Sequence, residues 1–176
     1  DSITILKDID DNSKLVDVKM LSPNYNKPRN HAIDTITIHC VVGQLTATQI
    51  GNLFLDPKKE ASSNYGVGVD CKIGLYVDES NRSWCSSSAS NDNRAITIEV
   101  ASDTKHPYHV NDDVLEKLID LLVDICKRNK IPKLIASTAE DEFLNWYYLK
   151  EEKGQYKKCS RCGEIKLANN KYFSLN

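Results

Sequence analysis

Two short segments of the chain alternate strictly between hydrophobic and polar residues. In DTITIHC, at 34–40, the apolar side chains fall on one strand face and the polar ones, ending with His39, fall on the other. AITIEV, at 95–100, repeats this pattern, with Glu99 on its polar face. Both segments predict strands. If these strands are neighbours in one sheet, His39 and Glu99 project from the same face.

Other patterns predict the elements around these strands. TATQ, at 46–49, has the spacing of a capping box and predicts a short helix that ends before Pro57. Two β-rich runs within 65–79 flank Asp70-Cys71-Lys72 and predict a hairpin. If the turn needs a positive φ there, a cysteine in place of the usual glycine strains it.

A longer helix is predicted to begin at Asn111, because apolar residues then recur on one helical stripe until Pro132. We expect short strands at 3–6, 16–21 and 133–137 as well. Strands and helices that alternate in this way favour an α/β fold with a mixed central sheet flanked by helices.

Composition narrows the class of protein. The 176 residues are 40% hydrophobic and 27% charged, as in a globular domain with a proper core. A net charge of −2 argues against nucleic-acid binding by the whole chain. Apolar runs fall short of the ~18 residues that span a bilayer, so we expect no membrane partner. The first residues, DSITILKDIDDNSK, are acidic and do not resemble a secretion signal. Four of the six cysteines are scattered among strand-like or helix-like segments, and free thiols fit synthesis in a reducing bacterial cytoplasm.

His39 and Glu99 are the candidate chemical groups. A metal-bound imidazole with a carboxylate close by is the minimum for metal-assisted hydrolysis. The alternative is a hydrogen-bonded strand histidine and an unrelated carboxylate at the rim of the sheet. Residues 83–95 are rich in Ser, Asn and Asp and include Trp84. Such a segment is either a solvated loop or the lining of a site for a hydroxylated ligand.

Two long stretches carry a resemblance to a known family. They are LSPNYNKPRNHAIDTITIHCVVGQLTA, at 21–47, and ASSNYGVGVDCKIGLYVDESNRSWCSSSASNDNRAITIEVASDT, at 61–104. Roughly residues 17–137 resemble the type 2, zinc-dependent N-acetylmuramoyl-L-alanine amidases, which are related to the peptidoglycan recognition proteins. The resemblance is greatest to endolysins of phages and prophages of clostridia and other Gram-positive bacteria.

The resemblance implies a mixed sheet with a groove that binds the glycan and stem peptide of bacterial peptidoglycan. It also implies hydrolysis of the amide between N-acetylmuramic acid and L-alanine in the cell wall. On this basis, His39 is the first zinc ligand and Glu99 the catalytic carboxylate. The same resemblance suggests Tyr65 as a substrate-binding residue, and it suggests that Asn64, Trp84 and Arg94 lie near the groove and bind substrate or support its loops.

The last part of the chain departs from the family. The family takes a second zinc-binding histidine and a third ligand from a segment after the strand near 137, but all four histidines here precede position 110. Zinc hydrolases normally need three protein ligands. Cys159 and Cys162 are the candidate replacements. We therefore divide the chain into an amidase-like domain, 1–137, and a divergent tail, 138–176.

The tail itself leaves alternatives open. Its first part, as far as Lys153, is predicted to be helical, and its CxxC resembles half of a zinc knuckle. It could join the zinc site, bind metal across a dimer, or bind no metal. Two other functions remain open for the chain: a peptidoglycan-binding module without catalysis, and a truncated amidase fused to a nucleic-acid-binding tail.

Overall fold

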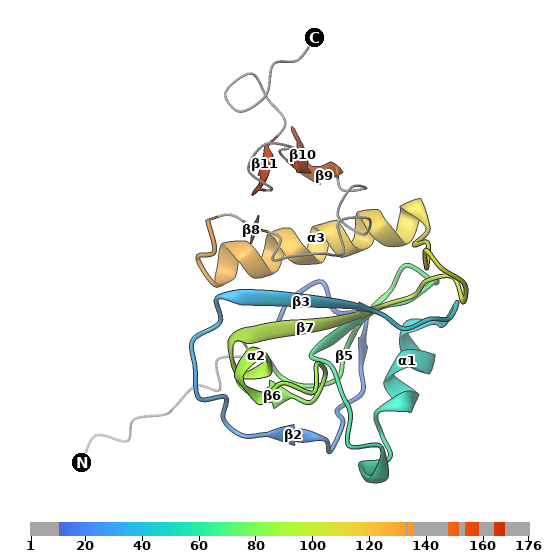
Figure 1. The fold of residues 1–176 in the computed structure, drawn as a ribbon, viewed down its shortest axis with the longest axis vertical. Coiled ribbons are helices and arrows are strands. Elements are labelled where there is room, and N and C mark those ends of the chain that lie inside the picture. The colour runs from blue at the N-terminus through green and yellow to red at the C-terminus, as the bar shows by residue number, and fades with distance from the viewer. Residues whose placement is uncertain (1–10, 133, 136–147, 152–153, 159–163, 168–176) are drawn as a thin grey trace, which may run out of the picture.

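A computed structural model of the chain describes residues 11–132, 134–135, 148–151, 154–158 and 164–167. Its centre is a five-stranded sheet with the order β1-β5-β4-β7-β3 (Figure 1). The bounds are Val18–Lys19 for β1, Thr35–Cys40 for β3, Tyr65–Val67 for β4, Ile73–Leu75 for β5 and Ala95–Val100 for β7. β7 runs parallel to both neighbours, whereas β4 and β5 form an antiparallel hairpin. The predicted mixed α/β fold is confirmed.

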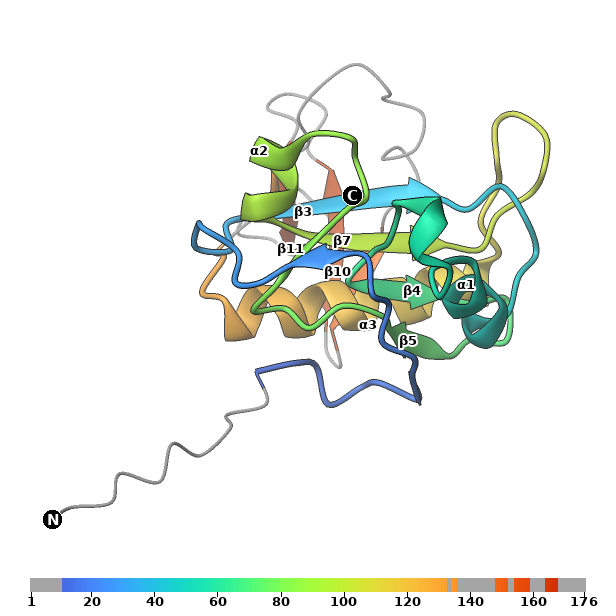
Figure 2. The same cartoon turned by 90° about the horizontal axis from the view of Figure 1, so that it is seen from below.

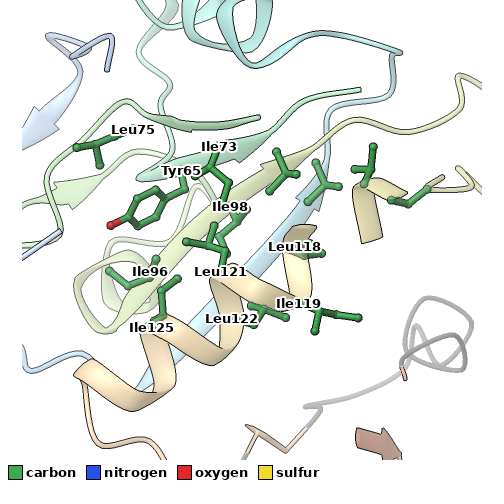
Figure 3. Packing of buried hydrophobic residues seen from close by; sticks show 14 residues of the cluster. Tyr65, Ile73, Leu75, Ile96, Ile98, Leu118, Ile119, Leu121, Leu122 and Ile125 are labelled. Atoms are coloured by element: carbon green, nitrogen blue, oxygen red, sulfur yellow. The ribbon is translucent and has the colours of Figure 1, made fainter. Parts of the chain in front are cut away.

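One face of the sheet is the hydrophobic core, covered by α3, Asp112–Arg128 (Figures 1 and 3). Leu118, Leu121 and Ile125 of α3 are fully buried, and they belong to the same cluster as Ile96 and Ile98 of β7. Burial of each such side chain contributes roughly 1.5–3 kcal/mol. The Asn111 side chain makes no capping hydrogen bond to the first turn of the helix, and acidic residues in that turn supply the favourable interaction with the helix dipole.

The other face of the sheet carries smaller elements (Figure 2). α2, Ala89–Arg94, packs near β7, and the two-residue strand β6, Arg82–Ser83, pairs with β2, Tyr25–Asn26. α1, Ala47–Leu53, lies beside β4 and β5. Because residues of β3 and β7 alternate between the faces, the core receives their isoleucines and this second face receives their polar side chains.

The local signals at α1 and at the hairpin have clear structural counterparts. Thr46 Oγ1 accepts a hydrogen bond from the Gln49 N–H at 3.2 Å, and Gln49 Oε1 accepts one from the Thr46 N–H at 2.8 Å, so the predicted capping box is confirmed. A 3-10 helix, Pro57–Lys59, follows α1. In the β4–β5 turn, Cys71 has φ 55°. A non-glycine residue in this conformation is strained by about 1–2 kcal/mol, as expected for a cysteine at this point.

Three strands of the tail and β8, which precedes it, form a second sheet in the order β8-β11-β10-β9. They are Leu134–Ile135 for β8, Tyr148–Glu151 for β9, Gly154–Lys158 for β10 and Glu164–Leu167 for β11. The described strands β9–β11 lie on the side of α3 away from the central sheet (Figure 1). The prediction of helix as far as 153 is wrong for β9, because its backbone pairs with β10. The strand predicted at 3–6 lies outside the described residues.

None of the helices in the described ranges is long and apolar enough to cross a membrane.

Candidate active site

His39 and Glu99 occupy partner positions on the parallel strands β3 and β7. Both side chains leave the sheet on the face opposite α3, near the carboxyl ends of their strands, and His39 Nδ1 lies 3.8 Å from Glu99 Oε1. The His39 side chain is 39% exposed and that of Glu99 is 15% exposed. The predicted placement of the two groups on one face is therefore confirmed, and an imidazole and a carboxylate meet where solvent can reach them.

Cys85 adds a third group that the sequence did not single out. Its Sγ lies 3.7 Å from His39 Nδ1 and 3.8 Å from Glu99 Oε1. One ligand atom from each of the three residues falls within 4.8 Å of the other two. Cys85 follows β6 by two residues, in the loop before α2. The sequence signal that could have found Cys85 is its spacing from Ser83. Ser83 contacts Thr97, and Cys85, two residues after Ser83, contacts Glu99, two residues after Thr97.

The segment that carries Cys85 is held by a buried carboxylate. Asp92, in α2, accepts a hydrogen bond from the Cys85 N–H at 3.0 Å and others from the Ser86 N–H and hydroxyl. On the other side of Cys85, the Trp84 N–H donates to Ser62 Oγ at 3.0 Å. These bonds restrict the backbone on both sides of the thiol, so the thiol is positioned before any ligand arrives.

Burial controls the charges at this site. Desolvation raises the pKa of Glu99 to about 7, although a hydrogen bond from the Cys85 thiol opposes the shift. Desolvation also raises the pKa of Cys85, and the carboxylates of Glu99 and Asp92 raise it further. Near neutral pH, the Glu99 carboxyl can therefore either accept or donate a proton, while the thiol without a bound cation stays neutral.

The three donors fit a zinc ion in type and spacing. Imidazole nitrogen, thiolate sulfur and carboxylate oxygen are all zinc ligands, with bond lengths of about 2.0–2.3 Å, so ligand atoms around a tetrahedral ion are roughly 3.4–3.6 Å apart. The distances here are 3.7–3.8 Å, from His39 Nδ1 to Cys85 Sγ, from His39 Nδ1 to Glu99 Oε1 and from Cys85 Sγ to Glu99 Oε1. Shifts of a few tenths of an ångström bring the three atoms to the spacing found around zinc.

Asn64 is expected near the groove or in support of its loops, and the structure places it inside the fold. Its side chain is fully buried. The amide oxygen accepts a hydrogen bond from the Thr97 N–H at 3.1 Å, and the amide nitrogen donates to the Val77 carbonyl at 3.1 Å. Asn64 therefore joins β7 to the chain that follows β5, and its role in the fold is structural.

Tyr65 also requires a correction. It pairs with Ile98, and its ring lies in the core on the α3 side of the sheet (Figure 3). The residue is fully buried, and its hydroxyl donates to Glu79 Oε1 at 2.5 Å while it accepts from the Ser13 N–H at 2.9 Å. The physical reason is strand alternation: Gly66, the next residue, is the one opposite Glu99. The Tyr65 side chain therefore lies on the opposite face of the sheet from His39 and Glu99.

Trp84 lies next to the cluster of His39, Cys85 and Glu99 in the sequence, whereas Arg94 lies at the other end of β7. Trp84 directly precedes Cys85, is half-buried, and its indole N–H donates to Asn26 Oδ1 at 2.7 Å. Arg94 precedes β7, at the amino end of the strand, and pairs with the exposed Asp34 at 2.6 Å. Glu99 lies near the other end, so Arg94 is not brought into the cleft. Cys159 and Cys162 lie outside the described residues.

A hollow of about 540 Å³ lies elsewhere, and its lining includes Arg29, Glu79 and Arg128 but none of the three clustered groups. Its two arginines already have partners: Arg128 Nη2 donates to Glu79 Oε1 at 2.6 Å, and Arg29 donates to backbone carbonyls such as that of Glu79, at 2.6 Å. Because the hydrogen-bonding groups of these arginines are already used within the protein, we interpret the hollow as a structural contact region and not as a second candidate active site.

Comparison with known proteins assigns the class. The family model described as N-acetylmuramoyl-L-alanine amidase matches residues 29–143, which is more than half of the chain. The chain belongs to this family of amidases. The match includes β3, β4 and β7, and with them His39, Cys85 and Glu99. No curated protein matches the chain by sequence.

Solved structures agree with the fold. A mutant structure of PlyL has a TM-score of 0.55 and 14% identity, over 65% of this chain and 76% of that chain. A mutant endolysin from Bacillus subtilis has a TM-score of 0.53 and 15% identity, over 65% and 77%. A selenomethionine derivative of AmpD has a TM-score of 0.53 and 17% identity, over 68% and 78%. At these identities the similarity shows the fold alone.

Proposed function

We propose that the chain is a zinc-dependent peptidoglycan amidase of the endolysin type, from a phage or prophage of a clostridial or other Gram-positive host. Its reaction is hydrolysis of the amide between N-acetylmuramic acid and the L-alanine of the stem peptide. The observation that supports this most is the pairing of His39 with Glu99, with 3.8 Å between Nδ1 and Oε1 at the carboxyl ends of neighbouring strands. Membership of the amidase family supports the same reaction.

In this mechanism Glu99 handles the protons. Its pKa of about 7 suits a group that takes a proton from the attacking water and passes it to the departing amine. His39 would hold zinc, which when bound polarises the amide carbonyl and lowers the pKa of water. The loop bonded to Asp92 holds Cys85 beside these groups. Trp84, next to Cys85, is the aromatic surface nearest in sequence on which a sugar or peptide could stack.

We further propose the division into an amidase domain, 1–137, and a divergent tail, 138–176. The zinc ligands that the family draws from its final segment have no histidine counterpart here, since all four histidines precede position 110. We expect zinc-dependent hydrolysis to be weak unless the tail supplies the two missing ligands. We also propose that the protein is made in the bacterial cytoplasm and acts on the cell wall.

The test is hydrolysis of Gram-positive cell walls by the whole chain, read as release of free L-alanyl amino groups. We expect release that is abolished by a chelator and restored by zinc. A His39→Ala variant should lose it, whereas a Lys58→Ala variant, changed at an exposed residue of the 3-10 helix, should not. Binding of a muramyl peptide without any product would contradict the proposal and identify a non-catalytic binding module.

A further inference from the structure

We propose that Cys85 is a metal ligand in this chain, together with His39, in place of a ligand that the family takes from its final segment. The inference deepens the proposed function, since it concerns the same metal. It does not require hydrolysis, however, because metal binding can be measured by itself. The new element is a thiolate ligand from the loop between β6 and α2.

The geometry is the first argument. Cys85 Sγ is 3.7 Å from His39 Nδ1 and 3.8 Å from Glu99 Oε1, so the sulfur lies beside both groups rather than beside one. An ion placed between sulfur and nitrogen needs about 2.3 Å to the first and about 2.0–2.1 Å to the second. These lengths are compatible with the observed separation with little movement of either side chain.

The support of the loop is the second argument. The Cys85 N–H donates to the buried carboxylate of Asp92 at 3.0 Å, and the adjacent Trp84 N–H donates to Ser62 Oγ at 3.0 Å. Two residues earlier, Ser83 Oγ lies 2.7 Å from Thr97 Oγ1 on β7. The thiol is thus tied both to α2 and to the strand that carries Glu99. Ligands that are positioned in this way lose little conformational freedom on binding.

Charge is the third argument. The carboxylates of Glu99 and Asp92 both act electrostatically on the Cys85 sulfur. A dication placed against the sulfur complements these negative charges. A nucleophilic thiolate is typically activated by a positive group such as a protonated histidine, but here a Glu99 carboxylate oxygen lies about as near to Sγ as the His39 imidazole does and opposes that activation. Metal ligation therefore suits the surroundings of Cys85 better than attack on the substrate.

Cobalt(II) replacement on the whole chain tests the proposal, because a cobalt–thiolate bond gives a charge-transfer band in the near ultraviolet. We expect the wild-type chain to show this band and Cys85→Ser to lose it, with metal affinity more than about 10-fold weaker, since even the loss of an outer-shell partner costs about 10–100-fold. Cys85→His should lose the band but recover affinity, which shows that the site still folds.

Two matched controls separate Cys85 from the other thiols. Cys126→Ser, on α3, and the double variant Cys159→Ser/Cys162→Ser should both keep the band. A band that survives Cys85→Ser, or one that disappears only in the double variant, overturns the proposal, as does the absence of metal binding by the wild type. Zinc-dependent wall hydrolysis without a Cys85-dependent band would leave the proposed function standing and reject only this ligand. A Cys85-dependent band without hydrolysis would support Cys85 as a metal ligand and reject the proposed function.

Discussion

His39 and Glu99 are register partners on parallel strands, and their side chains approach to 3.8 Å on the face of the sheet that α3 leaves uncovered. The same register pairs Ile38 with Ile98 on the buried face. A slip of one residue in either strand would therefore exchange an isoleucine for an ionisable group in the core. The core that stabilises the sheet thus also sets the geometry of the candidate active site.

Replacement of Glu99 by glutamine should abolish most hydrolysis. The amide cannot accept the proton of the attacking water, so we expect kcat to fall by about 10²–10⁴-fold, the usual contribution of a general base. Metal affinity should change much less, because His39 and Cys85 remain. Wall hydrolysis and zinc content, measured on the same preparation, test this. The matched control is Glu60→Gln, at an exposed position. Unchanged kcat in Glu99→Gln would reject the proposed role.

The same variant should change the pH dependence of stability in the metal-free chain. Burial raises the pKa of Glu99 from 4.5 to about 7. The fold therefore favours the protonated form, and this contribution is present below pH 4.5 and lost as pH rises through 7. Glutamine stays neutral, so Glu99→Gln should gain up to about 3 kcal/mol over wild type between pH 5 and pH 8. Urea unfolding with a chelator at both pH values measures this, and an equal difference at both would contradict it.

Tyr65→Phe should destabilise the fold without harming the cleft. The change removes the hydroxyl that bonds Glu79 and the Ser13 N–H. A buried group left without its partner costs about 1–3 kcal/mol, so thermal or urea unfolding should shift accordingly. At a temperature where the variant is folded, kcat and KM should equal those of the wild type. A raised KM with unchanged stability would instead return Tyr65 to the substrate groove.

Arg94→Ala should have little effect on either stability or hydrolysis. Arg94 pairs with Asp34 at 2.6 Å, but both side chains are exposed and lie at the amino ends of β7 and β3. Exposed pairs of this kind contribute little because water and salt screen them. Steady-state kinetics of Arg94→Ala beside Asp34→Ala make the comparison. A KM that rises only in the arginine variant would show that the substrate reaches this end of the sheet.

The sequence predicts the strands, the capping box and the hairpin because their signals are local. Alternation in 34–40 and 95–100 also predicts that His39 and Glu99 share a face, once the two strands are neighbours. Cys85 could not be found in this way, because its approach to Glu99 depends on how a loop between β6 and α2 folds back onto β7. Because Cys85 lies two residues after Ser83, it could be placed beside Glu99 only once the contact of Ser83 with Thr97 is known.

The corrected residues show the same limit. Tyr65 adjoins Gly66, the residue opposite Glu99, and a shift of one position along a strand turns a side chain to the other face of the sheet. In the tail, charged and aromatic residues favour a helix locally, yet β9 pairs with β10. Strand pairing depends on partners elsewhere in the chain, so local propensity does not decide it.

The most direct measurement is anomalous X-ray diffraction at the zinc edge, on crystals of the whole chain grown with zinc. The account predicts one strong peak within bonding distance of both His39 Nδ1 and Cys85 Sγ, beside the Glu99 carboxylate. A zinc peak that touches neither side chain, or a cleft that stays without a peak at saturating zinc, would contradict it.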